Sequence, residues 1–306
     1  MDRLYDEVQN WMVRHKKTSV RPATYDRLER SLTLMGEFEI SNIPADVLTS
    51  EDIQDYINEL VSRGYALSTI KKQVHLIGEF ISYCNLKGTI TAPLHKGVKL
   101  PSETVVKKHK KEVVAYSQDE QRKLKAILLR GDSPVFYAAV LMMEAGLRVG
   151  ETLALEWEDI DFNRKAMRIH RTVVRIADSK RSYIQDGAKS FTSNRTIPLS
   201  SEAYWLLSYM KEHRSGLSPL VFHNSRGGLL TYEAVRWWVR KACDEAGVPY
   251  YGCHVFRHTF ATNCYNKGCD VKVLSKFLGH SDVTITYNVY IHLFGDALEE
   301  MRSILG

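Results

Sequence analysis

The amino-acid sequence predicts a protein of two domains, an N-terminal all-α helical bundle and a C-terminal domain of mixed α+β type. Three observations lead to this prediction. The chain has 306 residues, which is more than a single hydrophobic core usually organises. Apolar residues recur at helical spacing throughout residues 1–100, without strand alternation. Further along, helical segments flank short segments in which apolar and polar residues alternate, as they do in strands.

Four helices are expected in the N-terminal domain, at residues 4–15, 24–38, 48–64 and 67–88. Thr49 or Ser50 can cap the third helix, since acidic residues occupy the first turn that follows. Gly64 and Gly88 stand where the third and fourth helices should end. These features indicate a small helical bundle over residues 1–100.

Residues 101–115 are interpreted as a linker between the domains. The segment begins with a proline and contains four lysines, Lys107, Lys108, Lys110 and Lys111. Such a run of charge is compatible with a solvated tether. Its place between two domains is equally compatible with a strand that crosses the phosphate backbone of DNA.

The C-terminal domain is expected to span residues 116–306. Ser117 and Glu120 have the spacing of a capping box, which marks its first helix. A buried helix, a glycine-containing turn and a second helix are expected at residues 136–155. The polar segment at residues 177–189 is expected to separate two strands of a small sheet. The strands are expected at residues 165–176 and 190–200, and further helices at residues 202–214, 232–246 and from 254 onward.

The charge of the chain is unevenly distributed. Residues 1–104 hold 13 Lys and Arg against 14 Asp and Glu, whereas residues 105–306 hold 29 against 22, within a total net charge of +6. A basic larger part suits a polyanionic partner, although charge alone does not establish nucleic-acid binding.

The five cysteines are an odd number without a C-x-x-C pair, which argues against a disulfide framework and for a reducing cytoplasm. A zinc site built from Cys253, His254, His258, Cys264 and Cys269 is not favoured, because these spacings match no common zinc motif. No apolar run approaches the ~20 residues that cross a bilayer. The acidic residues near the N-terminus also argue against an export signal. We therefore expect a cytoplasmic protein without a metal.

Several side chains of the second domain suit the cleavage of a phosphodiester. Arginine binds phosphate bidentately and stays charged, so two arginines from separate segments could neutralise the non-bridging oxygens. Arg148 follows a hydrophobic helix, although an ion pair with Glu151 would also explain it. Arg257 follows His254 by three residues, so the two would share a helix face. Taken alone, this spacing is a weak signal.

Two further candidates have common alternative explanations. Lys189 precedes an expected strand and could donate a proton to a leaving oxygen, although most such lysines are only solvated. His280 follows Gly279 at an expected helix end, where a histidine often serves only as a C-terminal cap.

The order of these residues resembles the tyrosine recombinase family, also called the phage integrase family. The segments that carry the resemblance are "AGLRVGETLALEWEDID" around Arg148, "AKSFTSNRTIPL" around Lys189, "HVFRHTFAT" around His254 and Arg257, and "LGHSDVTITYNVYIH" after His280. The resemblance extends from about residue 117 to residue 292. The helices of residues 1–100 resemble the family's core-binding, SAM-like domain, in a weaker match.

The resemblance implies a tyrosine nucleophile, for which there are two candidates. Family members commonly place it nine residues after the Gly-His histidine, where this chain has Val289. A subgroup that includes integrases of conjugative transposons has one extra residue and the pattern T-x-N-V-Y-x-H. The segment "TYNVYIH" fits this pattern, with Tyr290 as the nucleophile and His292 two residues later. Tyr287 is then interpreted as an aromatic residue that packs against the helical core.

The family resemblance also implies the roles of the remaining residues. Arg148 and Arg257 would bind the scissile phosphate, while Lys189 would protonate the 5′-oxygen. His254 would act as an acid/base partner and His280 would donate a hydrogen bond to a non-bridging oxygen. The phosphoester is exchanged through a 3′-phosphotyrosine, so no cofactor is required, and no P-loop is found.

The implied partner is duplex DNA, around which the two domains would close. A homotetramer on two DNA sites is expected, with a C-terminal tail from about residue 291 packing on a neighbouring subunit. Accessory DNA-bending or excision factors are compatible with such a system. The subgroup favours integration and excision of a bacterial mobile element. The alternatives are resolution of chromosome or plasmid dimers, relaxation of DNA by a type IB topoisomerase, and a catalytically silent DNA-binding protein.

Overall fold

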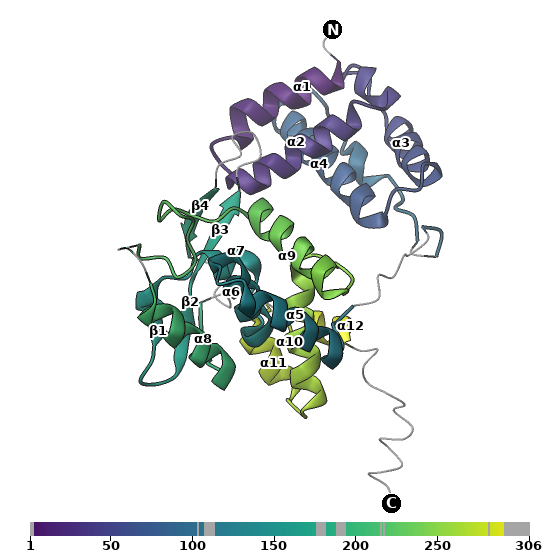
Figure 1. The fold of residues 1–306 in the computed structure, drawn as a ribbon. Coiled ribbons are helices and arrows are strands. Elements are labelled where there is room, and N and C mark those ends of the chain that lie inside the picture. The colour runs from purple at the N-terminus through teal and green to yellow at the C-terminus, as the bar shows by residue number, and fades with distance from the viewer. Residues whose placement is uncertain are drawn as a thin grey trace, which may run out of the picture. The chain divides into compact units, whose positions relative to one another are not determined.

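A computed structural model describes residues 3–102, 104–106, 114–175, 182–187, 194–214, 216, 218–280 and 282–290. For residues 285 and 288–290 the description covers the helix but not the side chains. The described residues form two compact units, one up to residue 106 and one from residue 114 (Figure 1). None of the described helices is long and apolar enough to cross a membrane.

The first unit is built from helices. They are α1 (Leu4–Trp11), extended by the π-helical segment Met12–Lys16, then α2 (Pro22–Met35), α3 (Ser50–Ser62) and α4 (Leu67–Lys87), with 3₁₀ turns at Glu39–Asn42 and Leu94–Lys96. Their apolar faces meet in one core that includes Val8, Leu32, Ile57 and Phe80. The four predicted helices are therefore present.

Local signals explain where these helices begin and end. Of the two candidate caps, Thr49 is the one used: its hydroxyl accepts from the Asp52 N–H at 3.2 Å and its own N–H donates to the Asp52 carboxylate at 2.8 Å. Gly88 ends α4 in the left-handed region with a φ of 75°, which glycine adopts without strain.

The second unit places a buried helix at its centre. Its helices are α5 (Gln118–Arg130), α6 (Pro134–Ala145), α7 (Val149–Leu153), α8 (Ser201–Glu212), α9 (Tyr232–Ala246), α10 (His254–Asn266), α11 (Val271–Leu278) and α12 (Val283–Tyr290). Helix α6 is apolar apart from Glu144 near its end and is largely buried, and it contacts α5, α7, α8, α9 and α10. The predicted capping box at the start of α5 is confirmed, since Ser117 N–H donates to the Glu120 carboxylate at 2.7 Å.

The strands of the second unit differ from the prediction. Antiparallel strands β1 (Ile160–Asp161), β2 (Ala166–Ile169) and β5 (Arg195–Pro198) form one sheet in the order β1-β2-β5. Strands β3 (Arg171–Arg175) and β4 (Ser182–Asp186), which are labelled in Figure 1, form a second, two-stranded sheet. The expected single strand at residues 165–176 is thus divided at His170. The segment at residues 177–189 was wrongly expected only to separate strands. It contains β4, in which Tyr183 and Ile184 pair with Val174 and Val173 across the ladder.

Candidate active site

A glycine turn between α6 and α7 brings Arg148 to the start of a helix. Gly146 ends α6 with a φ of 63°, in the left-handed region, and a Cβ at this position would lie 2.4 Å from the Phe260 ring. Arg148 follows two residues later as the N-cap residue of α7. Its side chain is 37% exposed, so a ligand can reach this residue.

The carboxylate of Glu151 holds both Arg148 and a second arginine, Arg195. Oε1 accepts from Arg148 Nη1 at 2.7 Å and from Arg195 Nη1 at 3.1 Å. Oε2 accepts from the Arg148 backbone N–H at 3.0 Å and from Arg195 Nη2 at 2.9 Å. An ionised carboxylate offers about four acceptor positions, so all of those on Glu151 are occupied. The considered pairing of Arg148 with Glu151 is confirmed, whereas Arg195 was not among the site residues predicted from the sequence.

A sequence signal for Arg195 did exist. Residues i and i+2 of a strand point to the same face, and Ile197, two residues after Arg195 in β5, is buried. An arginine on the core side of a strand requires a buried acidic partner. This alternation could have marked Arg195 as a residue with a role beyond solubility.

Glu151 should make the stability of the protein depend on pH. Burial alone would raise its pKa, but hydrogen bonds and charge from Arg195, followed by Arg148, lower the pKa from 4.5 to about 2. A carboxylate with a lowered pKa stabilises the folded state above its unfolded pKa and loses this effect as the pH falls toward its folded pKa. The lowering corresponds to about 3 kcal/mol of unfolding free energy.

We therefore expect the stability difference between the wild type and Glu151→Gln to shrink by about 2 kcal/mol as the pH is lowered from about 6 to about 3. Urea unfolding at a series of pH values measures this difference. Glu158→Gln, at an exposed position of the same unit, serves as the control. A wild-type advantage that stays constant over this range would contradict the assigned charge state.

The C-terminal end of α11 receives hydrogen bonds from three arginines. Three consecutive backbone carbonyl groups each accept from a different side chain: Phe277 from Arg195 Nε at 2.6 Å, Leu278 from Arg257 Nη2 at 2.6 Å, and Gly279 from Arg148 Nη2 at 3.2 Å. The last carbonyl groups of a helix lack partners within it and carry partial negative charge. The guanidinium groups supply both the missing donors and the opposite charge.

Arg257 and His254 come from α10. Arg257 is only 2% exposed, and its Nη1 donates to the Gly146 carbonyl at 2.8 Å. His254, one turn earlier on the same helix, is exposed. Partial desolvation, then the charges of Arg257 and Arg148, lower the pKa of His254 below its ordinary 6.5. Of the two predicted phosphate-binding arginines, Arg148 therefore offers the larger accessible surface.

His280 is half-buried beside the same arginines. Burial, followed by the charges of Arg257 and Arg148, lowers its pKa to about 4, so its imidazole is neutral at neutral pH. Its Nδ1 lies 2.7 Å from the hydroxyl of Thr286, a fully buried residue of α12. This contact orients the ring and engages Nδ1, which leaves Nε2 for another partner. Thr286 was not among the site residues predicted from the sequence.

The two tyrosines lie on α12, which packs against α11. Tyr290 is the last residue of this helix. Tyr287 is 47% exposed, so the interpretation that it packs against the helical core is wrong. The contact between Thr286 and His280 links α12, the helix that carries Tyr290, to the group of Arg148, Arg195 and Arg257, hereafter the arginine cluster.

Other predicted site residues lie outside the described residues. They are Lys189, the linker residues Lys107, Lys108, Lys110 and Lys111, and the tail from about residue 291. Their assignments stay predictions.

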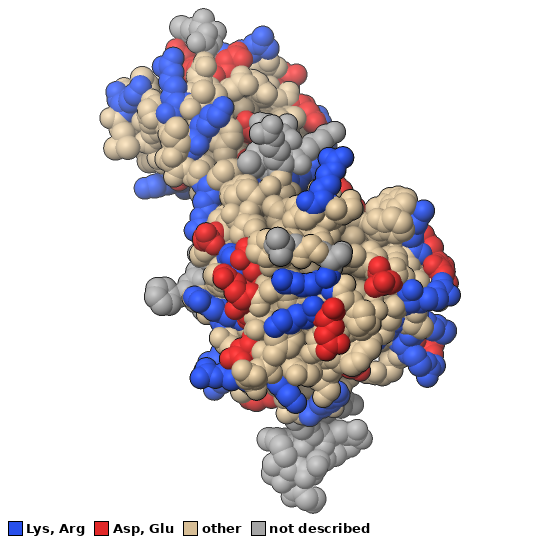
Figure 2. Space-filling model, turned by 60° about the vertical axis from the view of Figure 1, so that its left-hand side comes forward, with Lys and Arg blue, Asp and Glu red and all other residues tan. Residues whose placement is uncertain are grey.

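The charges of the cluster suit an anion. The cluster contains three guanidinium groups, from Arg148, Arg195 and Arg257, and one ionised carboxylate, from Glu151, which gives a net charge of +2 with neutral histidines. Over the face of the molecule shown in Figure 2, acidic side chains lie among the basic ones. Among the described residues, no group of His, Cys, Asp or Glu is arranged to hold a metal ion.

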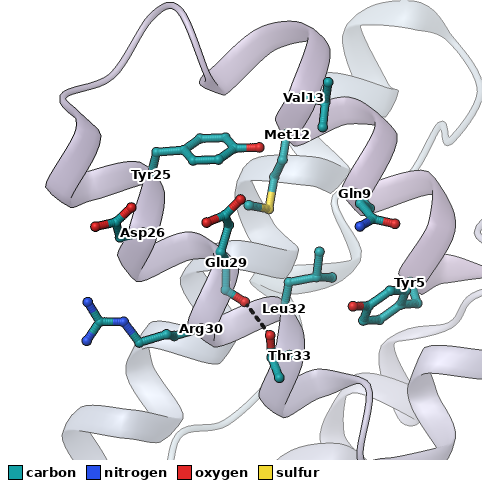
Figure 3. A pocket seen from close by; sticks show the side chains of 10 residues that line it. All are labelled: Tyr5, Gln9, Met12, Val13, Tyr25, Asp26, Glu29, Arg30, Leu32 and Thr33. Atoms are coloured by element: carbon teal, nitrogen blue, oxygen red, sulfur yellow. Dashed lines mark hydrogen bonds between the residues drawn. The ribbon is translucent and has the colours of Figure 1, made fainter. Parts of the chain in front are cut away.

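A cavity in the first unit has the opposite character. It encloses about 360 Å³ between α1 and α2, and its lining includes Asp26 and Glu29 with one arginine, Arg30 (Figure 3). Asp26 is buried. Two carboxylates against one guanidinium disfavour a phosphate, so this cavity does not compete with the arginine cluster as a phosphodiester site.

Comparison with known proteins identifies the class. Residues 107–296 match the phage integrase family. The chain belongs to this family, the tyrosine recombinases, and is accordingly a site-specific recombinase that transfers DNA strands. Among its relatives, a XerC-like tyrosine recombinase from Caldanaerobacter subterraneus subsp. tengcongensis is 30% identical, over 95% of this chain and 79% of that protein. The resemblance predicted from the sequence segments is confirmed.

Solved structures share the fold. A Tn1549 transposon integrase in complex with transposon right end DNA superposes with a TM-score of 0.81 and 20% identity, over 99% of this chain and 100% of that chain. A lambda integrase tetramer bound to a Holliday junction gives a TM-score of 0.65 and 17% identity, over 94% of this chain and 77% of that chain.

Proposed function

We propose that this recombinase integrates and excises a mobile genetic element, and that Tyr290 is its nucleophile. The observation that carries the chemistry is the convergence of Arg148, Arg257 and His280 from three separate segments, beside the helix that ends in Tyr290. The segment "TYNVYIH", which matches the pattern of conjugative-transposon integrases, supports the mobile-element assignment.

The reaction exchanges one phosphoester for another. The Tyr290 oxygen attacks the scissile phosphorus, the bond from phosphorus to the 5′-oxygen breaks, and a 3′-phosphotyrosine and a free 5′-hydroxyl result. His254 accepts the tyrosine proton and Lys189 donates a proton to the 5′-oxygen. The free 5′-hydroxyl of a second strand reverses these steps and reseals the DNA, so the bond energy is conserved.

The arginines and His280 stabilise the transition state. Arg148 and Arg257 neutralise the non-bridging oxygens, whose charge grows as the tyrosine attacks. In this assignment the Thr286 hydroxyl donates to Nδ1, so neutral His280 carries its proton on Nε2 and donates a hydrogen bond from there. A phenol has a pKa of about 10, so a cationic site also favours the tyrosinate form that attacks.

The partners follow from the same assignment. The helical first unit binds DNA as a core-binding domain, and the linker lysines contact the phosphate backbone. Four copies assemble on two duplexes, with each tail packed on a neighbour. The tetrameric arrangement of lambda integrase on a Holliday junction supports this assembly. Dimer resolution is the second candidate, and the XerC-like relative supports it.

Covalent trapping tests the chemistry without knowledge of the target site. The wild-type protein is incubated with a pool of end-labelled duplexes that are nicked and randomised around the nick, and adducts are recovered through successive rounds of selection. We expect adducts that withstand denaturing gels and contain phosphotyrosine. A protein that binds the pool but yields no adduct after several rounds would support a silent DNA-binding protein instead. Efficient relaxation of supercoiled plasmids that lack the selected sequence would support a topoisomerase.

A further inference from the structure

Arg195 is buried and fully engaged beside the candidate active site. Its side chain is 7% exposed. Two of its nitrogens donate to the two oxygens of Glu151, and Nε donates to the Phe277 carbonyl at 2.6 Å. This two-pronged pairing with a carboxylate is the strongest arrangement that a guanidinium forms. Arg195 is therefore held in one orientation, against two groups that also adjoin the catalytic candidates.

Sharing Glu151 determines how much positive charge Arg148 can offer. A pair of Arg148 and Glu151 alone would have no net charge. With Arg195 included, the three groups carry a net charge of +1, and half of the acceptor positions of Glu151 are turned away from Arg148. Arg148 still has its orientation set by Glu151, but its charge is not cancelled there. A phosphate bound to Arg148 thus meets an arginine that is both fixed and cationic.

Arg195 also connects three elements of the second unit. It stands at the start of β5, reaches the first turn of α7 through Glu151, and reaches the end of α11 through Phe277. The same helix end accepts Arg148 at Gly279, and His280 follows directly. A shift of Arg195 would therefore displace the Arg148 guanidinium and the His280 ring together.

We propose that Arg195 is a positioning residue for DNA cleavage, which offsets the charge of Glu151 and fixes the end of α11, so that Arg148 and His280 meet the scissile phosphate in the productive orientation. This inference rests on the proposed function, because it concerns how the phosphate is bound. Arg195 acts through Arg148 and His280.

The test compares Arg195→Gln with the double variant Arg195→Gln/Glu151→Gln. The cluster of Arg148, Arg195, Arg257 and Glu151 has a net charge of +2, which falls to +1 in Arg195→Gln and returns to +2 in the double variant. Single-turnover adduct formation on a nicked duplex selected with the wild type gives the rate, and a gel shift gives the DNA affinity. Arg164→Gln, an exposed arginine between β1 and β2, is the matched control.

We expect Arg195→Gln to form adducts about 100-fold more slowly with DNA affinity little changed, the double variant to recover at least about tenfold, and Arg164→Gln to behave as the wild type. A residue that only supported the fold would make the double variant worse, since a second buried partner is lost. A double variant no faster than Arg195→Gln, or a fully active Arg195→Gln, would overturn the proposal.

Arg195→Lys covers the case in which Arg195→Gln does not fold. Lysine keeps the charge but cannot reach both Glu151 oxygens and the Phe277 carbonyl at once. We expect a loss of about tenfold in adduct rate with unchanged DNA affinity, and full activity would overturn the proposal. Absence of adducts from the wild type would contradict the proposed function itself, whereas equal rates of wild type and Arg195 variants would refute only the role of Arg195.

Discussion

Tyr290→Phe is expected to abolish the covalent protein–DNA adduct, with a loss of more than about 10³-fold in its rate of formation. Phenylalanine keeps the ring but removes the oxygen that attacks the phosphorus in the proposed mechanism. DNA binding should be unchanged, because the hydroxyl is not needed for contacts with the phosphate backbone elsewhere. Denaturing gels of nicked duplexes selected with the wild type measure the adduct, and a gel shift measures binding.

Tyr287→Phe is the matched control for this prediction, since it makes the same change one turn earlier on α12. We expect it to form adducts at close to the wild-type rate. Loss of the adduct in Tyr287→Phe alone would move the nucleophile by three residues and refute the match of "TYNVYIH" to the transposon-integrase pattern. Adducts that persist in both variants would show that neither tyrosine is the nucleophile.

Arg148→Ala is expected to slow adduct formation by about 10³-fold. Arg148 is the more accessible of the two phosphate-binding candidates, and it is held by Glu151 and the Gly279 carbonyl. Its removal leaves the growing charge on the non-bridging oxygens without its main partner. DNA affinity should fall by less than about tenfold, since one phosphate contact among many is lost. Single-turnover trapping and a salt titration of binding separate these two effects.

Arg148→Lys should recover only a small part of the rate, because an ammonium group cannot serve Glu151, a backbone carbonyl and a phosphate together. Arg122→Ala, at an exposed position of α5, is the control and should retain full activity. Arg148→Ala with a cleavage rate within about tenfold of the wild type would contradict the assignment of this arginine to the scissile phosphate.

The fold was predictable from the sequence where the signals are local. A capping box needs only residues 117 and 120, and a left-handed glycine needs only its own backbone, so the starts of α3 and α5 and the end of α4 follow from neighbouring residues. The strands were less predictable. The alternating pattern of residues 165–176 continues through His170, but the chain changes sheets there, and only pairing with distant strands reveals the change.

The same contrast applies to the active-site candidates. The types and order of Arg148, His254, Arg257 and His280 could be predicted from the sequence, because they follow the pattern of the tyrosine recombinase family. Hydrophobic periodicity in the sequence likewise predicted an N-terminal helical region and a C-terminal region of helices and strands.

Tertiary structure alone decided how those residues are held. Arg195 meets Glu151 across 44 residues and Phe277 across 82 residues, and over such separations no local pattern identifies the partners of a side chain. It also decided that Arg257 is buried while Arg148 remains accessible, and that Thr286 orients His280. The physical reason is that burial and the partners of a charged group depend on which elements pack together, whereas helix caps, turns and periodicity depend on adjacent residues.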